Sequence, residues 1–207
     1  MTGDFRITLA YLKELGACRD GQREFRKAFP DGAGYQETLD KCADAGRVDF
    51  GKWLLDKLGP TDDVRIYQEP IEDRNKVIIF AGRIEFEADI NVKHIFAGCG
   101  IEAGWGIKAG CGIKAGCDIE AGRGIEAGWG IEAGWGIEAG YDIEAGWGYG
   151  IFAGIRVKIE LWSSLAIVEA NTKPTNLISG HWVEPNAQKN GGSYVETNYT
   201  TNPKRRV

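Results

Sequence analysis

The sequence has few of the residues that carry catalytic or metal chemistry. It contains only two histidines, His94 and His181, and neither belongs to a nucleophile or metal-binding motif. Its five cysteines include no CxxC pair and are expected to be reduced thiols. We therefore predict no catalytic residue, no bound metal, no cofactor and no enzymatic activity.

The sequence also lacks long apolar runs and a net positive charge. No uninterrupted apolar run is long enough to span a bilayer, and the N-terminus lacks the charged and apolar regions of a signal peptide. The formal net charge of −5 provides no general basic field for nucleic-acid phosphates. These observations predict a cytoplasmic protein without membrane association or direct nucleic-acid binding, whose partner is another protein.

Glycine, in contrast, is abundant and periodic. The chain has 30 glycines in 207 residues, about twice the usual frequency of ~7%. Most follow a hexapeptide unit, Ile-Glu/Lys-Ala-Gly-x-Gly/Asp, which begins without a slip at nine isoleucines: Ile95, Ile101, Ile107, Ile113, Ile119, Ile125, Ile131, Ile137 and Ile143. Fixed short repeats of this kind are typical of solenoids.

The repeat predicts short strands joined by glycine corners. In a strand, residues two apart face the same side, so Ile and Ala point inward and Glu or Lys points outward. A helix is excluded because a third of the residues are glycine, at about 1 kcal/mol each relative to alanine. Two coils fit the period: three hexapeptides per coil would stack Cys99 on Cys117 and Trp129 on Trp147, whereas two would stack Cys99 on Cys111.

The flanking sequence differs in character from the repeat. Apolar stripes that end at Gly16, Pro30, Gly46 and Gly59 predict three or four short helices, too small a bundle to be stable alone, so we expect it to dock on a neighbouring element or subunit. The fold class is therefore α+β, a small N-terminal helical bundle followed by a hexapeptide-repeat β-solenoid. The predicted segments are a helical module (1–59), a linker (60–76), the solenoid (77–170) and an irregular extension (171–207).

Two details of the flanks are also predicted. Residues 155–170, in which apolar side chains alternate from Ile155 to Leu161, indicate a half-buried strand that closes the stack. In the extension, short strands are expected at 177–183 and 194–199, with the last eight residues disordered.

The fourth residue after each repeat isoleucine, which we call the slot, is variable and often aromatic. If the slots face outward, they form an aromatic ladder flanked by glutamates; if inward, the rings fill the core, and the sequence leaves both open. The predicted binding residues for a protein partner are the outward glutamates and the aromatic slots, Glu102, Trp105, Glu120, Glu126, Trp129, Glu132, Trp135, Glu138, Tyr141, Glu144 and Trp147. Exposed rows of Trp and Tyr are typical of binding faces.

Two stretches resemble known families. The segment with Gly16-Ala17-Cys18 and Phe29-Pro30-Asp31-Gly32 resembles a small helical module at the front of many uncharacterised phage and bacterial proteins. The Gly-Ile-Glu-Ala-Gly-Trp array is similar to the repeats that follow this module in phage-borne genes. A phage origin implies an inhibitor of host defence, such as an anti-CRISPR or DNA-mimic protein, acting in the cytosol of the host cell.

Two functional hypotheses follow from the sequence. In the first, the protein binds and inhibits a host protein or complex, in defence or nucleic-acid processing, through the acidic and aromatic face of the solenoid. A net charge of −5 between residues 102 and 144 supports mimicry of a nucleic-acid backbone. In the second, the solenoid is an assembly module that self-associates into a homo-oligomer.

Overall fold

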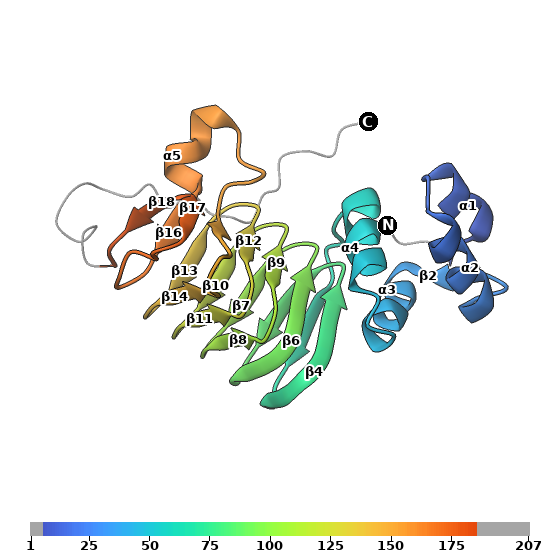
Figure 1. Cartoon of the computed structure of the whole chain (residues 1–207), viewed down its shortest axis with the longest axis horizontal. Helices are drawn as coiled ribbons and strands as arrows, with labels where there is room; N and C mark the ends of the chain where they lie inside the picture. The colour runs from blue at the N-terminus through green and yellow to red at the C-terminus, as the bar shows by residue number, and fades with distance from the viewer. Residues whose placement is uncertain (1–5, 186–207) are drawn as a thin grey trace.

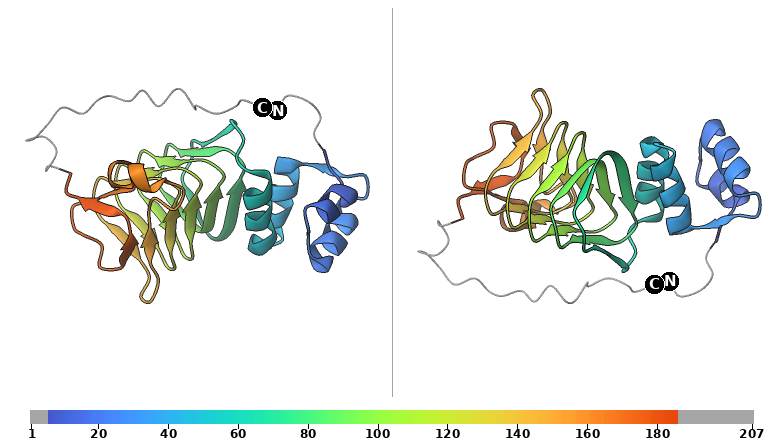
Figure 2. Two further views of the ribbon diagram at one scale, coloured as in Figure 1. Left: turned by 90° about the horizontal axis from the view of Figure 1, so that it is seen from above. Right: turned by 90° about the horizontal axis from the view of Figure 1, so that it is seen from below.

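A four-helix N-terminal module and a β-solenoid make up the computed structural model, which describes residues 6–185. The helices of the module lie at one end of the rod, and the coils stack away from them (Figure 1). Views from above and below show the same order, with the helices beyond the first coil (Figure 2). The α+β fold predicted from the sequence is confirmed, as a helical module followed by a parallel β-solenoid.

The helical module consists of two helix pairs joined by a small sheet. Glycines in the left-handed region, Gly16, Gly46 and Gly59, stand just after three of the helices. Thr8 Oγ1 accepts a hydrogen bond from the Tyr11 backbone N–H and begins the first helix. The elements are β1 (Arg6–Ile7), α1 (Leu9–Glu14), α2 (Arg19–Ala28), β2 (Ala33–Gly34), α3 (Tyr35–Asp44) and α4 (Val48–Leu58).

The solenoid has three sides, which we number in chain order. Face 1 is a seven-stranded parallel sheet of β3 (Val64–Tyr67), β5 (Arg83–Phe86), β7 (Ile101–Ala103), β10 (Ile119–Ala121), β13 (Ile137–Ala139), β16 (Ile167–Glu169) and β18 (His181–Val183). Face 2 contains the first halves of β4 (Ile71–Phe80) and β6 (Ile90–Ala97), then β8 (Ile107–Ala109), β11 (Ile125–Ala127) and β14 (Ile143–Ala145). Face 3 contains the second halves of β4 and β6, then β9 (Ile113–Ala115), β12 (Ile131–Ala133), β15 (Ile151–Phe152) and β17 (Leu177–Ser179).

The strand register decides between the two possible coils. Ile119 pairs with Ile101 on one side and with Ile137 on the other, so each isoleucine stacks on the third one along the repeat. Three hexapeptides therefore form one coil, and the alternative with two is excluded. Cys99 and Cys117 lie in neighbouring coils, as this geometry predicts.

The core is a column of isoleucine and alanine. The nine repeat isoleucines, from Ile95 to Ile143, are at most 2% exposed, while the residue between Ile and Ala on each strand faces outward. Burying one such side chain contributes roughly 1.5–3 kcal/mol. The repeat thus builds its core from one large and one small side chain per strand.

The two glycines of each repeat have different roles. At most glycines that follow alanine, a Cβ would overlap a carbonyl oxygen one coil earlier; for Gly128 this is the oxygen of Gly110. A Cβ at the last glycine, as in Gly112, would lie 3.5 Å from the carbonyl oxygen of Gly130, which is ordinary contact. This difference agrees with the presence of Asp118 and Asp142 at the last position. It does not account for Gly104 and Gly110, where a Cβ would find room.

Helix α3 covers the exposed edge of the first coil. The Gln36 side chain donates from Nε2 to the Ile79 carbonyl (2.9 Å) and accepts from the Ala81 N–H (2.9 Å), so its amide mimics a neighbouring strand at β4. Arg65 in β3 pairs with Asp40 in α3 at 3.0 Å. The module is therefore a cap on the solenoid, and its core continues into Ile79 and Phe96 of that sheet.

The predicted linker at 60–76 is wrong. It forms β3 and the first half of β4, so the solenoid begins at Val64 rather than at residue 77. Pro60 and Pro70 lie just outside these strands and do not interrupt them. Tyr67 and Ile71 pack against the solenoid core, which explains how a segment with a polar composition joins it.

The strand predicted at 155–170 is wrong over Ile155 to Leu161 and present only at 167–169, as β16 (Ile167–Glu169). Gly154, with φ of 76°, directs the chain away, and a loop with η1 (Ile159–Leu161) and α5 (Trp162–Leu165) stands out from the rod (Figure 1). Ile159 is 82% exposed. The place on face 1 that this strand would occupy is taken by β16, where Val168 pairs with Ile137.

The C-terminal extension is only partly described. β17 and β18 lie within the stretch predicted as strand at 177–183, and they continue faces 3 and 1. The solenoid therefore extends to Val183 rather than ending at residue 170. The strand predicted at 194–199 and the disorder predicted for the last eight residues lie outside the described residues.

Candidate protein-binding surface

The slot residues lie at the corners between faces and point outward. Trp105 is 43% exposed, Trp129 47%, Trp135 37%, Tyr141 58% and Trp147 fully exposed. Strand alternation would have placed them inside, but each repeat strand is short and the slot falls in the turn after it. The rings therefore do not fill the core.

The slots do not form one continuous ladder. Because each coil contains three hexapeptides, they divide among three corners. The corner between faces 1 and 2 carries Trp105, Arg123 and Tyr141; the corner between faces 2 and 3 carries Cys111, Trp129 and Trp147; and the corner between faces 3 and 1 carries Cys99, Cys117 and Trp135. The predicted single row is thus three short rows.

Two of these corners show specific ring contacts. The guanidinium of Arg123 lies 4.1 Å from the ring centre of Trp105, a cation–π arrangement that places both side chains on one ridge. At the next corner, the Trp129 ring stacks on Tyr149 at 6.0 Å rather than on Trp147. The two-residue insertion Tyr149-Gly150 causes this change, and the loop after β14 projects from the rod (Figure 2).

The predicted glutamates are also divided among the faces. Glu126 and Glu144 lie on face 2, where Glu126 pairs with Lys108 at 2.6 Å. Glu132 lies on face 3, 3.5 Å from Lys114. Glu102, Glu120 and Glu138 share face 1.

Face 1 carries the continuous acidic row. Strand pairing places Glu85 before Glu102 and Glu169 after Glu138, so five glutamates follow one another, one per strand. Neighbouring strands are about 4.8 Å apart. Among the described residues, the ion pairs of this row come from Arg83 at its first end, 3.3 Å from Glu85 and 3.9 Å from Glu102.

The electrostatics of the row match its geometry. Partial burial raises the pKa of Glu120, and the charges of Glu138, Asp118 and Glu102 raise it further. The pKa of Glu169 is raised by burial and by Glu138. Asp118, whose pKa is raised mainly by burial, accepts a 2.7 Å hydrogen bond from the Gly136 N–H beside the row. Face 1 thus concentrates negative charge at a cost that an added cation would relieve.

We expect Glu120→Gln to raise the free energy of unfolding by about 0.5 kcal/mol at pH 7, because like charges on adjacent strands repel. The folded-state pKa of Glu120 lies above its unfolded value, so the native chain takes up the proton first as the pH falls. The advantage of the variant should therefore shrink between pH 7 and about pH 4.5. Denaturant unfolding at several pH values measures it.

Glu126→Gln is the matched control for this prediction. It sits at the same repeat position one face further on, but it is paired with Lys108, so its neutralisation should give no gain. His94, whose pKa is lowered mainly by burial, has the opposite pH dependence: the unfolded chain takes up its proton first, so it lowers stability as the pH falls. This contribution is common to the wild type and both variants, so it cancels in the differences between their free energies of unfolding. An equal gain for both variants would contradict the assignment of repulsion to face 1.

Three members of the surface were missed from the sequence. Glu85 and Glu169 lie in irregular units outside the strict repeat, and only the strand register shows that they extend the row. Tyr149 lies in the insertion that breaks the period. A search for Ile-Glu pairs in the flanks would have found Glu85, whereas Glu169 follows a valine. Within residues 6–185, no group of three or more histidine, cysteine and acidic side chains is placed to hold a metal ion.

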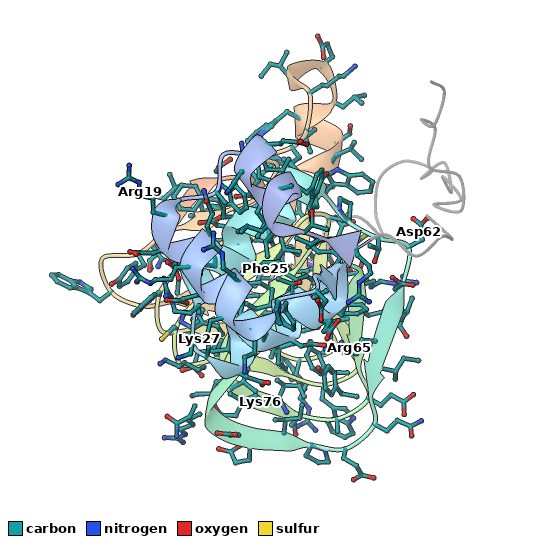
Figure 3. The ribbon with its side chains drawn as sticks, turned by 90° about the vertical axis from the view of Figure 1, so that its right-hand side faces the viewer. Arg19, Phe25, Lys27, Asp62, Arg65 and Lys76 are labelled. Carbon is teal, nitrogen blue, oxygen red and sulfur yellow. The ribbon has the colours of Figure 1, made fainter. Side chains whose placement is uncertain are left out.

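The helical module contains a separate apolar cavity of about 360 Å³ between its two helix pairs. Phe25, Phe50 and Trp53 line it, with Arg47 at its margin. Figure 3, seen from the helical end, shows Phe25 within the module and Arg19 and Lys27 at its outside, with Arg65 and Lys76 on the first coil behind. Arg47 forms salt bridges with Glu24 and Asp49, so its charge is already neutralised within the module.

The fold and surface together define a three-sided hexapeptide β-solenoid protein with a helical cap. More narrowly, residues 1–58 match the family model of the YdhT N-terminal domain, which covers the helical module and no part of the repeat. This agrees with the expectation of a recurrent N-terminal module. The searches of curated proteins and of solved structures gave no match. No helix within residues 6–185 has both the length and the apolar character needed to cross a bilayer.

Proposed function

We propose that the protein is a non-enzymatic binding protein that engages a basic surface of a protein partner through face 1. The observation that carries this proposal is the row of five glutamates, Glu85 to Glu169, at one charge per strand. Trp105 and Tyr141 border it on one side and Trp135 on the other. Trp and Tyr are enriched among the interface residues that contribute most of the binding energy.

The spacing of the row supports a partner that normally binds nucleic acid. One charge every ~4.8 Å along a rod is close to the density of a single DNA strand, which has one charge per ~3.4 Å. A groove lined with Lys and Arg would therefore accept face 1 in place of a phosphate backbone. Combined with the phage-type resemblance, this favours a host defence or nucleic-acid-processing protein in the host cytosol as the partner, and inhibition as the result.

The test compares two double charge reversals in the same coils. Glu120→Lys/Glu138→Lys alters face 1, and Glu126→Lys/Glu144→Lys alters the same repeat positions on face 2. The wild-type protein and both variants are used as bait in bacterial lysate, and captured proteins are identified by mass spectrometry. We expect the face 1 variant to lose the partner by at least about tenfold, since close charge pairs contribute about 1.5–7 kcal/mol, and the face 2 variant to retain it.

Inhibition is then measured on the captured protein. Wild-type protein should compete with DNA or RNA for its binding, and raised salt should weaken the complex. Equal capture by all three baits would contradict a role for face 1. Circular dichroism of each variant shows that the solenoid is intact.

A second candidate is self-association of the solenoid. Large apolar side chains are exposed after residue 146: Trp147, Tyr149, Ile155, Ile159, Leu161 and Ile178. These side chains belong to the last coils of the described rod, and exposed apolar surface is typical of interaction sites. Light scattering distinguishes the candidates, because a mass that rises with concentration and depends on Trp147 favours assembly, whereas a constant monomer mass with a captured partner favours inhibition.

A further inference from the structure

Two thiols meet at the corner between faces 3 and 1. Cys99 and Cys117 occupy the slot in successive coils, with their sulfur atoms 3.0 Å apart. The Cys117 N–H donates to the Cys99 carbonyl at 3.2 Å, and the strands on both sides of the corner are paired in register. Their Cα atoms are therefore about one strand spacing apart, ~4.8 Å, within the roughly 4.4–6.8 Å range of disulfides.

The two sulfur atoms differ in their electrostatic environment. Either thiol can donate the hydrogen bond between the two sulfur atoms. With Cys117 as the donor, this bond and the nearby Arg83 lower the pKa of Cys99. The same interaction and burial raise the pKa of Cys117, with Arg156 opposing them. Asp118 raises the pKa of both. Both side chains are half-buried, so small molecules can reach them.

We propose that Cys99 and Cys117 form a redox-active dithiol that hydrogen peroxide converts into a disulfide between adjacent coils. The Cys99 thiolate attacks the peroxide, an S–O bond forms, the O–O bond breaks, and the departing hydroxide takes a proton to become water. The Cys117 sulfur then attacks the sulfenic acid on Cys99, an S–S bond forms, the S–O bond breaks, and the second water leaves with the Cys117 proton. Two thiols lose two electrons and the peroxide gains them.

The other cysteines provide internal controls. Cys111 occupies a slot at a different corner, between faces 2 and 3. Cys42 lies in the helical module, where burial raises the pKa of its thiol to about 11, so it is protonated at neutral pH. Cys18 is exposed and precedes helix α2 in the helical module, so it also lies outside the corner. The disulfide should therefore join Cys99 and Cys117 and include none of the other three cysteines.

The disulfide should stabilise the rod. It closes a loop from one coil to the next, which restricts the unfolded chain. We expect the melting temperature of the oxidised protein to rise by about 5 °C or more relative to the reduced one. Dithiothreitol should reverse the change.

The experiment follows each cysteine by mass spectrometry. Reduced full-length protein is treated with stoichiometric hydrogen peroxide, remaining thiols are alkylated, and trypsin is added. Cleavage after Lys93, Lys108, Lys114 and Arg123 separates Cys99, Cys111 and Cys117 into different peptides. We expect a disulfide between the tryptic peptides 94–108 and 115–123. It should form at least about tenfold faster than Cys111 is oxidised.

Three variants give the order of events. Cys117→Ser should stop the reaction at a sulfenic acid on Cys99 that dimedone traps, Cys99→Ser should abolish the rapid phase, and Cys111→Ser should change nothing. A bridge that includes Cys111, a bridge between molecules, or equal oxidation rates for Cys99 and Cys111 would overturn the proposal. The wild-type measurement does not depend on whether a variant folds, and none of these outcomes bears on partner capture by face 1.

Discussion

Gly128→Ala is expected to lower the free energy of unfolding by about 3 kcal/mol or more. The added methyl group would overlap the carbonyl oxygen of Gly110 in the preceding coil. That contact is with backbone, which cannot move aside without breaking the pairing between β8 and β11. Denaturant unfolding followed by circular dichroism measures the loss.

Gly112→Ala is the matched control, since it introduces the same methyl group at the equivalent corner one coil earlier. Its Cβ would lie 3.5 Å from the Gly130 carbonyl oxygen, and the stability should stay within about 1 kcal/mol of the wild type. Similar losses for the two variants would mean that both glycines serve chain flexibility alone. The contrast therefore tests whether close stacking of coils selects glycine after alanine.

Gln36→Ala should cost about 2–4 kcal/mol, because it leaves the Ile79 carbonyl and the Ala81 N–H without the partners they have in the native state. Both residues are almost fully buried, so water does not easily replace the amide. Hydrogen exchange at the Ala81 amide reports the site directly and should become faster.

Gln22→Ala controls for removal of a glutamine from the same module. Gln22 donates to the Ala17 carbonyl within the helical module. The Gln22→Ala variant should leave hydrogen exchange at the Ala81 amide unchanged. Unchanged exchange in Gln36→Ala as well would show that the edge of β4 is protected by other parts of α3.

The sequence predicted the repeat core well and its ends poorly. Periodicity fixes which side chains face inward, and Ile101 to Ile143 are buried as expected. The number of hexapeptides per coil stayed open because any whole number of them satisfies the same pattern. At the ends, composition was misleading: polar residues 60–76 join the sheet, and the alternating Ile155–Leu161 does not, since β16 takes the strand edge beside β13.

The sequence predicted which residues belong to the candidate surface but not how they are arranged on it. The glutamates and aromatic slots were identified, and the slots lie outside, yet they are spread over three faces and corners. Their neighbours are set by the three-hexapeptide coil, so Glu102 belongs with Glu120 rather than with Glu126. Only the register could group Glu85 and Glu169 with them.

The three-hexapeptide coil restricts how this protein can change length. Insertion or loss of a single hexapeptide would keep the isoleucine column intact but transfer every later residue to the next side of the rod, so Glu138 would leave the row of Glu120. Only a duplication or deletion of three hexapeptides preserves what each side displays. The insertion Tyr149-Gly150 avoids this by looping out at a corner, which leaves Ile151 paired with Ile131. Related arrays should therefore differ by whole coils wherever one side is under selection.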